Sequence, residues 1–271
     1  MNANIAPPAT EAAPPRIRVD GLRFGYDPSG RRGPVLEAFD LEVAESEFVS
    51  VVGPSGCGKS TLLSIIAGLL QADAGTVLID GQERPRPGPD RPMIFQDDAV
   101  FPWRTVAGNV EYGLQMKRIG RAERQRIVEE YLALVGLTDA RDLLPRQLSG
   151  GMRKRVDVAR AMALRPEILL LDEPFAALDV MTKEQLQVDF LTLWTATRMT
   201  AVFVTHDLEE ALFLSDRVVV MSRDPGRVIR DVRVPFARPR DLELRTSPAF
   251  QALRGELAGQ LRAVTGDLEA R

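Results

Sequence analysis

The sequence has little of the chemistry that would cross-link the chain or carry it through a membrane. Its 271 residues include one cysteine, Cys57, so no disulfide can form within the chain, and this favours a reducing compartment. No apolar run approaches the roughly 18–20 residues that a membrane-spanning helix needs. The first fifteen residues lack a basic segment followed by an apolar one, so they do not resemble a secretory signal. We therefore expect a cytoplasmic protein, which could still attach to a membrane through a partner.

A strong excess of positive charge is also missing. The chain carries 35 lysines and arginines against 38 aspartates and glutamates, which gives a net charge of −3 at pH 7. Proteins that bind a nucleic-acid backbone usually present a field of positive charge, so the composition argues against a nucleic-acid partner and leaves room only for a local basic patch. Apolar residues make up 45% of the chain, which is enough for one large domain or one domain with a subdomain.

Short apolar runs alternate with helical patterns along most of the chain. The run Phe48–Val52 is short and apolar apart from Ser50, and Ile168–Leu171 and Ala201–Val204 are continuously apolar, which is typical of strands buried on both faces. Further strands are predicted from Ile17 and at Val35–Val43, Thr76–Ile79, Met93–Phe95 and Val218–Met221, a loop at Glu83–Pro92, and helices at Thr61–Leu70, Arg121–Val135, from Ser149 and at Ser247–Leu261. Strands that alternate with helices in this way predict an α/β fold with a mostly parallel sheet.

The segment GPSGCGKS lies between a predicted strand and a predicted helix, which is the context of a phosphate-binding P-loop. Its glycines let backbone N–H groups point inward at phosphate oxygens, and the helix N-terminus adds its positive end. Lys59 can reach the β- and γ-phosphates of ATP, and the Ser60 hydroxyl can bind Mg²⁺. The residues expected to bind the triphosphate are Gly53, Pro54, Ser55, Gly56, Cys57, Gly58, Lys59, Ser60 and Thr61. Cys57 stands at a variable position and is expected to be a small residue without chemistry of its own.

Two carboxylates, Asp172 and Glu173, follow the predicted strand Ile168–Leu171. Such a pair at the end of a buried strand is costly unless a positive charge lies beside it, and a Mg²⁺ on Ser60 would supply that charge. We expect Asp172 to bind the metal through water, and Glu173 to act as the general base on the attacking water. The alternative is a solvated strand end.

A third segment, LSGGMRKR at Leu148–Arg155, resembles the signature of ABC-type ATPases, the nucleotide-binding subunits of ABC transporters. The resemblance implies a P-loop NTPase fold with an antiparallel β-subdomain and an inserted helical subdomain beside the parallel core sheet. It also implies a homodimer, in which Ser149, Gly150 and Gly151 of one copy contact the γ-phosphate bound to the other. Lys154 stands where the family often carries glutamine, and we expect it to alter contacts near the ribose of the facing nucleotide.

Further segments resemble this family in order along the chain. Gln96 resembles the glutamine that binds Mg²⁺ and contacts the attacking water, and the segment from Ala177 to Asp179 resembles the loop that crosses the dimer interface. His206, the only histidine, resembles the switch histidine that contacts the γ-phosphate. Tyr26 stands where an aromatic ring stacks on adenine; Phe24 is the runner-up, and plain strand packing is the alternative for either.

The resemblance divides the chain into three parts. Residues 1–15 are alanine, proline and small polar residues that cannot bury enough surface to order themselves, so a disordered tail is expected there. Residues 16–232 form the expected ABC ATPase domain, with the helical subdomain at about 97–160. Residues 233–271 form a C-terminal extension with a short helix.

Two segments resemble importer ATPases in particular. In the first, Phe101, Pro102 and Trp103 are expected to receive a cytoplasmic helix of a permease, although Trp103 could instead pack locally. The second, Arg227–Asp241, resembles the branch that serves nitrate, taurine and aliphatic-sulfonate importers. In it Arg238 and Arg240 are expected to form a solvated turn, with an anion site as the alternative.

The resemblance therefore implies an ATP-hydrolysing subunit at the cytoplasmic face of a bacterial inner membrane. Its expected partners are integral-membrane permease subunits and a periplasmic or extracellular solute-binding protein, which together select the solute. The alternative is a soluble ABC ATPase that acts on nucleic acid or the ribosome. Members of that class carry a long coiled-coil insertion or a second ATPase unit, and this sequence contains neither.

Overall fold

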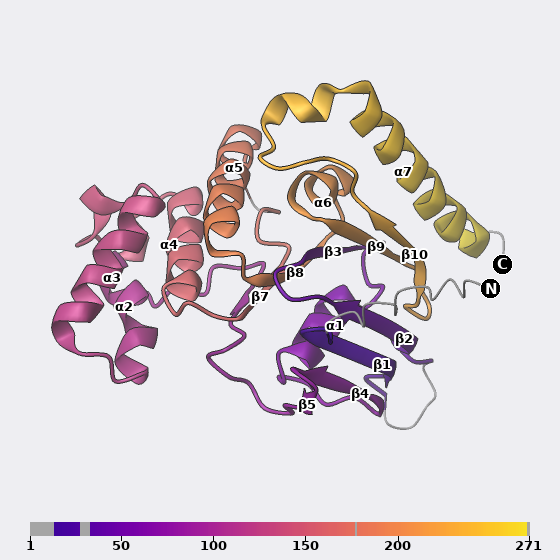
Figure 1. The fold of residues 1–271 in the computed structure, drawn as a ribbon, viewed down its shortest axis with the longest axis horizontal. Helices are drawn as coiled ribbons and strands as arrows, with labels where there is room; N and C mark the ends of the chain where they lie inside the picture. Colours follow the sequence, from indigo (N-terminus) through magenta and orange to yellow (C-terminus); the bar gives the residue numbers. More distant parts are fainter. Residues whose placement is uncertain (1–13, 28–32, 177, 270–271) are drawn as a thin grey trace, which may run out of the picture.

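The computed structural model describes residues 14–27, 33–176 and 178–269 (Figure 1). All but the last two residues of the tail expected at 1–15 lie outside this part of the chain, as does Ala177. The described strands form a six-stranded sheet in the order β10-β9-β3-β8-β7-β6 and a four-stranded sheet in the order β2-β1-β4-β5.

The six-stranded sheet is mostly parallel. Its strands are β3 (Phe48–Val52), β6 (Met93–Ile94), β7 (Ile168–Asp172), β8 (Thr200–Thr205), β9 (Arg217–Met221) and β10 (Val228–Arg233). Only the β9–β10 pair is antiparallel. Along β3, Phe48 and Val52 belong to one apolar core while Val49 and Val51 belong to another, on the other face. Because both faces of the sheet are covered, its strands read as continuous apolar runs, and the predicted α/β class is confirmed.

The register of the parallel strands brings four chain segments to one edge of the sheet. Val52 of β3 pairs with Thr205 of β8, and Asp172 of β7 pairs with Val204. The P-loop, the two carboxylates and His206 each follow one of these strand ends, and Gln96 follows β6. In parallel sheets ligands bind outside the carboxyl ends of the strands, so the fold alone gathers the predicted site residues.

The second sheet is antiparallel and packs across helix α1 (Lys59–Ile66). It consists of β1 (Ile17–Phe24), β2 (Leu36–Val43), β4 (Ala74–Ile79) and β5 (Gln82–Glu83). Leu62 and Leu63 of α1 share one buried core with Ile17 and Phe39 of this sheet and with Val49 of β3. This core fixes the helix whose first turn closes the P-loop.

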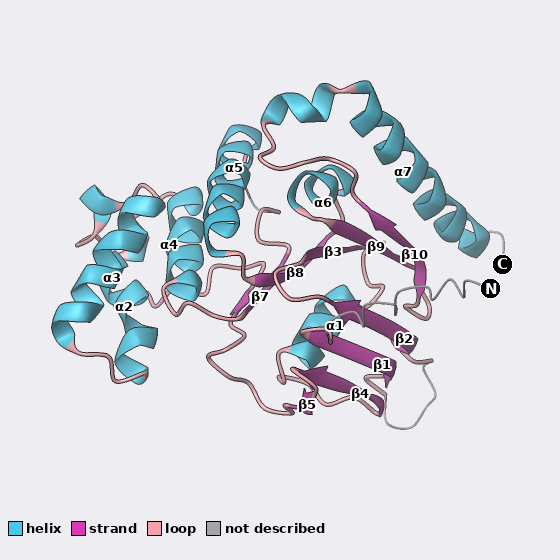
Figure 2. Ribbon diagram, in the orientation of Figure 1, coloured by secondary structure: helices cyan, strands magenta, loops and turns pink. Residues whose placement is uncertain are grey.

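Helices cover the other face of the parallel sheet (Figure 2). Three of them, α2 (Val106–Met116), α3 (Arg121–Leu134) and α4 (Gly150–Met162), pack together at the end of the molecule remote from the antiparallel sheet. Helices α5 (Val180–Thr197) and α6 (Leu208–Leu214) lie closer to the strands, where Trp194 of α5 stacks on Phe48 at 5.3 Å between ring centroids. Among the described residues no helix is both long and apolar enough to cross a bilayer.

The C-terminal part of the chain differs most from expectation. Helix α7 runs from Pro248 to Glu269, eight residues beyond its predicted end, because residues 262–269 contain no proline that would end a helix. Phe250 of α7 is fully buried and stacks on Phe236. The expected domain boundary after residue 232 falls one residue before the end of β10.

Arg238 and Arg240 do not form the solvated turn that was expected. Arg240 is buried and donates to the backbone carbonyls of Leu212, Phe213 and Ser215, so it closes the end of α6. Burial lowers the pKa of Arg240 to about 10, which still leaves it charged at neutral pH. The Arg238 guanidinium donates to Asp216 at 2.9 Å. The last carbonyls of a helix lack hydrogen-bond partners within the helix and attract cationic donors. The sequence did not show that these arginines lie beside the end of α6.

Candidate active site

The P-loop curls between the end of β3 and the start of α1. Gly56 and Gly58 adopt positive φ angles of 80° and 101°. A Cβ atom on Gly58 would lie 2.8 Å from Cδ2 of Leu36, so both the backbone and the space around it require glycine there. Lys59 is buried, and its Nζ donates to the carbonyls of Gly53 at 2.9 Å and Pro54 at 3.2 Å. Lys59 thus lies against the loop on which the ATP phosphates are expected to bind.

The two carboxylates point to different partners. Asp172 accepts a hydrogen bond from the Ser60 hydroxyl at 2.8 Å. Burial raises the pKa of Asp172, and the Ser60 hydrogen bond only partly opposes this. The Glu173 carboxylate accepts from Nδ1 of His206 at 2.8 Å and lies 3.8 Å from Nζ of Lys59. Glu173 also has a φ of 42°, in the left-handed region that a residue with a side chain seldom adopts. Such strain gathers at functional sites, which fits the role predicted for Glu173.

Several of these groups line one cavity of about 660 Å³. Its lining residues are Tyr26, Val35, Ser55, Gly56, Gly58, Lys59, Ser60, Thr61, Gln96, Glu173 and His206. Val35 is a lining residue that was not predicted as a site residue. Gly53, Pro54, Cys57 and Asp172 are predicted site residues that do not line it. Cys57 is buried in the core below the loop, and burial raises its pKa, so the thiol has no part in the cavity.

The aromatic residues at the mouth of the cavity differ in exposure. Tyr26 is 66% exposed, and its hydroxyl shares a hydrogen bond with the Thr61 hydroxyl at 3.0 Å. Phe24 is 8% exposed and packs edge-on against Tyr26 with ring centroids 4.9 Å apart. Of the two rings, that of Tyr26 offers a free face to a ligand on the loop.

A P-loop occurs in several families of ATPases, and a match to one family model shows which of them this chain belongs to. Residues 36–176, more than half of the sequence, match the ABC transporter family. The chain belongs to the ABC transporter family. It is an ABC-type ATPase, and the fold class predicted from the sequence is confirmed.

Relatives and solved structures agree with the family. The nitrate import ATP-binding protein NrtD of Synechococcus elongatus is 46% identical, over 83% of this chain and 84% of its own length. The bicarbonate transport ATP-binding protein CmpD of the same species is 43% identical over 91% and 90%. The taurine import ATP-binding protein TauB of Mesorhizobium japonicum is 44% identical over 90% and 96%. The predicted importer ATPase is thereby confirmed over a soluble ABC ATPase that acts on nucleic acid or the ribosome.

Two solved structures share the fold of this ABC ATPase. The ATP-binding cassette MJ0796, in a dimeric post-hydrolysis state bound to ADP and phosphate, is 32% identical with a TM-score of 0.72, over 82% of this chain and 100% of that one. The protein cbiO1 of Clostridium perfringens, part of the ABC transporter complex cbiONQ, is 26% identical with a TM-score of 0.74, over 82% and 89%.

The predicted signature residues of the ABC ATPase lie away from the cavity. Ser149 caps α4 and accepts from the Met152 amide at 3.2 Å, while Asp179 caps α5 and accepts from the Thr182 amide at 3.1 Å. The two helix starts approach closely, since a Cβ atom on Gly151 would lie 2.4 Å from Cγ2 of Thr182. Ser149, Gly150, Gly151 and Asp179 therefore form a group of their own, and none lines the cavity of the same chain.

Lys154 has a different place from the one expected. It is buried rather than turned toward a facing nucleotide, and its Nζ donates to the carbonyls of Phe95 at 2.9 Å and Gln96 at 3.0 Å. Asp98 and Asp157 each lie 4.0 Å from the same nitrogen. Lys154 thus joins the signature helix to the Gln96 segment. Its position could have been inferred from spacing, because it falls on the buried stripe of α4 with Gly151 and Val158.

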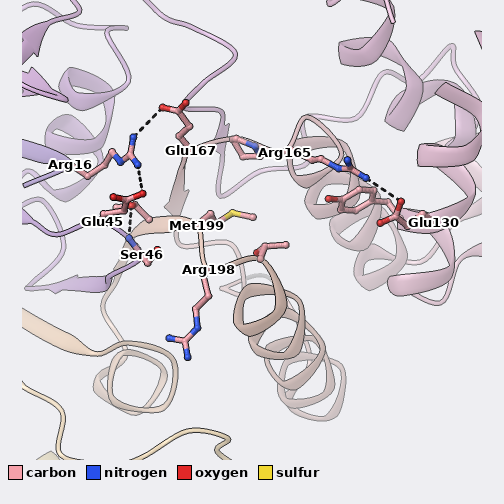
Figure 3. Close-up of a pocket in the computed structure, with 12 residues that line it drawn as sticks. Arg16, Glu45, Ser46, Glu130, Arg165, Glu167, Arg198 and Met199 are labelled. Atoms are coloured by element: carbon pink, nitrogen blue, oxygen red, sulfur yellow. Dashed lines mark hydrogen bonds and ion pairs between the residues drawn. The ribbon is translucent and has the colours of Figure 1, made fainter. Parts of the chain in front are cut away.

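A second cavity, of about 440 Å³, opens at the opposite, amino-terminal ends of the parallel strands (Figure 3). Arginines and glutamates line it, but they pair with one another: Arg16 contacts Glu45 at 2.7 Å and Glu167 at 3.3 Å, and Arg165 contacts Glu130 at 3.4 Å. None of the predicted site residues lies there. Most charges of this cavity pair with one another and Arg198 lies over the ring of Trp194, so this cavity is not the active-site candidate.

Proposed function

We propose that this ABC ATPase hydrolyses ATP as a homodimer and energises the import of a small solute through a separate permease. One observation carries the proposal: the P-loop, Glu173, Gln96 and His206 meet at one cavity, while Ser149 and its neighbours form a second group elsewhere. The functional unit is then the ABC ATPase domain at 16–232, with its helical subdomain at about 97–160 and the extension at 233–271.

ATP would bind with its triphosphate on the loop and its base at Tyr26. Lys59 exchanges its two backbone carbonyl partners for the β- and γ-phosphates, which are stronger acceptors because they are charged. Phe24 is buried, which supports Tyr26 as the ring that stacks on adenine. Thr61, held by the Tyr26 hydroxyl, links that ring to the first turn of α1.

The oxygen donors at the site fit a magnesium ion. The Ser60 hydroxyl, the Asp172 carboxylate and the Gln96 amide are the hard oxygen ligands that Mg²⁺ takes together with nucleotide phosphates. The described residues contain no cluster of three or more His, Cys, Asp or Glu side chains that could bind a metal, as befits an ion that arrives with ATP. When bound, the ion would neutralise phosphate charge and hold Asp172 ionised against its burial.

The hydrolytic step falls to Glu173, which would accept a proton from the attacking water. His206 and Lys59 hold this carboxylate in place from two sides, at 2.8 and 3.8 Å. A γ-phosphate above the loop would compete with Glu173 for the Lys59 ammonium group and for an N–H of His206, which gives His206 its proposed role as the sensor of that phosphate. The exposed side chain of Gln96 at the cavity wall would position the water.

The second copy completes the site. The two helix N-termini that carry Ser149, Gly150, Gly151 and Asp179 would offer backbone donors to an anion, but none of these residues lines the P-loop cavity of its own chain. Val180 and Met181 follow Asp179 and are 70% and 76% exposed. Neighbouring large apolar side chains with this exposure suit a surface that a second copy covers. The dimeric state of MJ0796 supports a head-to-tail homodimer with two ATP molecules at its interface.

A membrane permease is the proposed third party. Leu69, Phe95, Trp103 and Met116 are large apolar residues that remain exposed, and Trp103 is 73% exposed against Phe101 at 5.7 Å. The Phe101–Trp103 pair suits contact with a short amphipathic helix of a permease. By analogy with NrtD, CmpD and TauB, we propose a peripheral place at the cytoplasmic face of the bacterial inner membrane, a solute-binding protein, and a solute of the nitrate, sulfonate or taurine type. Failure to co-purify with any membrane protein from its own host would contradict the importer assignment.

Replacement of the proposed base tests the enzymatic assignment. Glu173→Gln keeps the shape of the side chain but cannot accept the proton, so kcat should fall by at least about 100-fold while ATP binding persists. Glu167→Gln is the matched control, since Glu167 lies at the other end of the parallel sheet. Turnover and bound nucleotide are measured on the purified protein. Normal steady-state hydrolysis by Glu173→Gln would show that Glu173 is not the base.

A further inference from the structure

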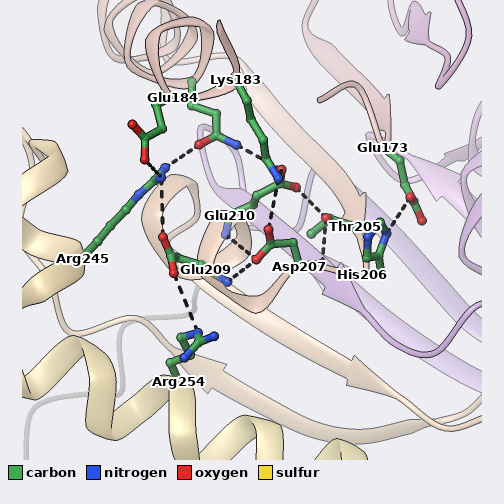
Figure 4. A network of polar contacts seen from close by, with 11 residues as sticks. Glu173, Lys183, Glu184, Thr205, His206, Asp207, Glu209, Glu210, Arg245 and Arg254 are labelled. Atoms are coloured by element: carbon green, nitrogen blue, oxygen red, sulfur yellow. Dashed lines mark hydrogen bonds and ion pairs between the residues drawn. The ribbon is translucent and has the colours of Figure 1, made fainter. Parts of the chain in front are cut away.

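A row of buried polar side chains runs from the C-terminal extension to the His206 segment (Figure 4). Its members are Arg245, Gln187, Glu210 and Thr205, and each is at most 9% exposed. Polar groups this deep are unfavourable unless they are hydrogen-bonded, and here each one bonds to the next. Three consecutive buried hydrogen bonds across three helical segments and a strand end call for an explanation beyond packing.

The row begins at the guanidinium of Arg245. One of its N–H groups donates to Oε1 of Gln187 in α5. The guanidinium stacks over the ring of Phe213 at 4.3 Å, and Glu184 and Glu209 each lie 3.6 Å from it. Arg245 is thus held by a ring and two carboxylates while it reaches inward to the amide.

The row continues to the residues on both sides of His206. Nε2 of Gln187 donates to Glu210 at 3.1 Å, and the Thr205 hydroxyl donates to the other carboxylate oxygen of Glu210 at 2.6 Å. The Asp207 amide in turn donates to the Thr205 hydroxyl at 3.0 Å. Lys183 neutralises Glu210 and Asp207 at 2.5 and 3.1 Å. Both neighbours of His206 are therefore tied to this network.

The direction of the hydrogen bonds gives Arg245 a specific task. A guanidinium can only donate, so it selects the orientation of the Gln187 amide in which the oxygen faces Arg245 and the NH₂ group faces Glu210. The opposite orientation would place an amide oxygen against the Glu210 carboxylate. Without Arg245, only Glu210 would still favour this orientation of the Gln187 amide. The buried amide oxygen of Gln187 would also lose its hydrogen-bond donor.

We propose that Arg245 is a positioning residue for the switch histidine, and that it acts through Gln187, Glu210 and Thr205. The C-terminal extension is then a working part of the nucleotide switch, because it fixes the backbone on which His206 contacts Glu173. The inference rests on the proposed role of His206 in hydrolysis. It concerns the rate of the chemical step, since no member of the row lines the nucleotide cavity.

Kinetics of Arg245→Met test the inference. Because coupling through such networks is modest, kcat should fall about 3- to 30-fold, while KM for ATP stays within about twofold of the wild type. Arg245→Lys keeps a cationic donor and should restore most of kcat. Arg254→Met is the matched control on the same extension: Arg254 contacts Glu209 at 3.8 Å but no member of the row, so its kcat should equal that of the wild type.

A double variant separates positioning from general loss of structure. If Arg245 acts through the amide, Gln187→Met should slow turnover, and adding Arg245→Met to it should cause no further loss. Additive losses, an unchanged kcat in Arg245→Met, or equal losses in Arg245→Met and Arg254→Met would overturn the inference. An inactive wild type would instead overturn the proposed function, so the two failures can be told apart.

Discussion

At the scale of single residues, Lys154 is the most informative side chain outside the cavity. Lysine is among the residues least often buried, yet here its ammonium group lies inside the protein against two backbone carbonyls. Burial lowers the pKa of Lys154, and the charges of Asp157 and Asp98 oppose that shift. Lys154 therefore loses contact with water but makes a fixed contact between the signature helix and the Gln96 segment. In the proposed dimer these two segments contact different nucleotides.

Removal of the Lys154 ammonium group should strongly destabilise the fold. Lys154→Met leaves two carbonyls without a donor and the buried carboxylate of Asp157 with less positive charge, so the free energy of unfolding should fall by about 3 kcal/mol. Arg126→Met removes an exposed arginine that pairs with Glu123 on the surface of α3, and it should leave the free energy of unfolding close to that of the wild type. Urea denaturation of both variants gives the comparison. Equal small losses would mean that Lys154 is no more than a surface charge.

At the scale of secondary-structure elements, the start of α6 is the point where the switch segment joins the fold. Asp207 caps this helix and accepts from the Glu209 amide at 2.8 Å. Burial alone would raise the pKa of Asp207, but the hydrogen bond and charge of Lys183 and the amides of the helix outweigh it, so the pKa is lowered. A carboxyl with a lowered folded-state pKa stabilises the fold above its unfolded value and loses that effect as the pH falls through the folded value.

This sign gives a prediction for the cap. Asp207→Asn should lower the free energy of unfolding by about 1 kcal/mol at pH 7, the usual loss on weakening a helix cap and its cationic contact. The difference from the wild type should begin to shrink below about pH 4, where this carboxyl becomes protonated in the unfolded chain, and should shrink further as the pH falls through the lower folded-state pKa. Denaturation curves between pH 3 and pH 7 test both statements. A difference that stayed constant with pH would exclude a charged Asp207 as its source.

The elements that the sequence predicts well are those whose pattern is local. Strands β3, β7 and β8 are buried on both faces and so read as apolar runs, and the P-loop and the Asp172–Glu173 pair are defined by their neighbours along the chain. Helix α5 was not predicted, because its apolar residues fall on several faces: Val180 is exposed while Phe190 is buried. Strand β10 is a charged edge strand, and α6 is too short for a periodic pattern to emerge. The polar row from Arg245 was out of reach, since its contacts join segments far apart in the sequence.

At the scale of the whole molecule, the separation of the P-loop cavity from the group around Ser149 on one chain is the central observation. In the proposed dimer the signature residues of a second copy complete the P-loop site, and a two-fold axis then completes both sites at once. ATP binding would in this way drive closure of the dimer. Helices α2, α3 and α4 would then transmit the closure movement to a permease.

Mixing two inactive variants measures this arrangement most directly. Lys59→Ala disables the P-loop, and Ser149→Arg disables the signature group, so each should lack turnover as a purified homodimer. In a mixed dimer one site combines both lesions while the other combines an intact P-loop with an intact signature group, so random mixing should restore up to about a quarter of wild-type ATPase activity. Mixtures that stay as inactive as their components, under conditions where mixed dimers demonstrably form, would contradict a site shared between two copies.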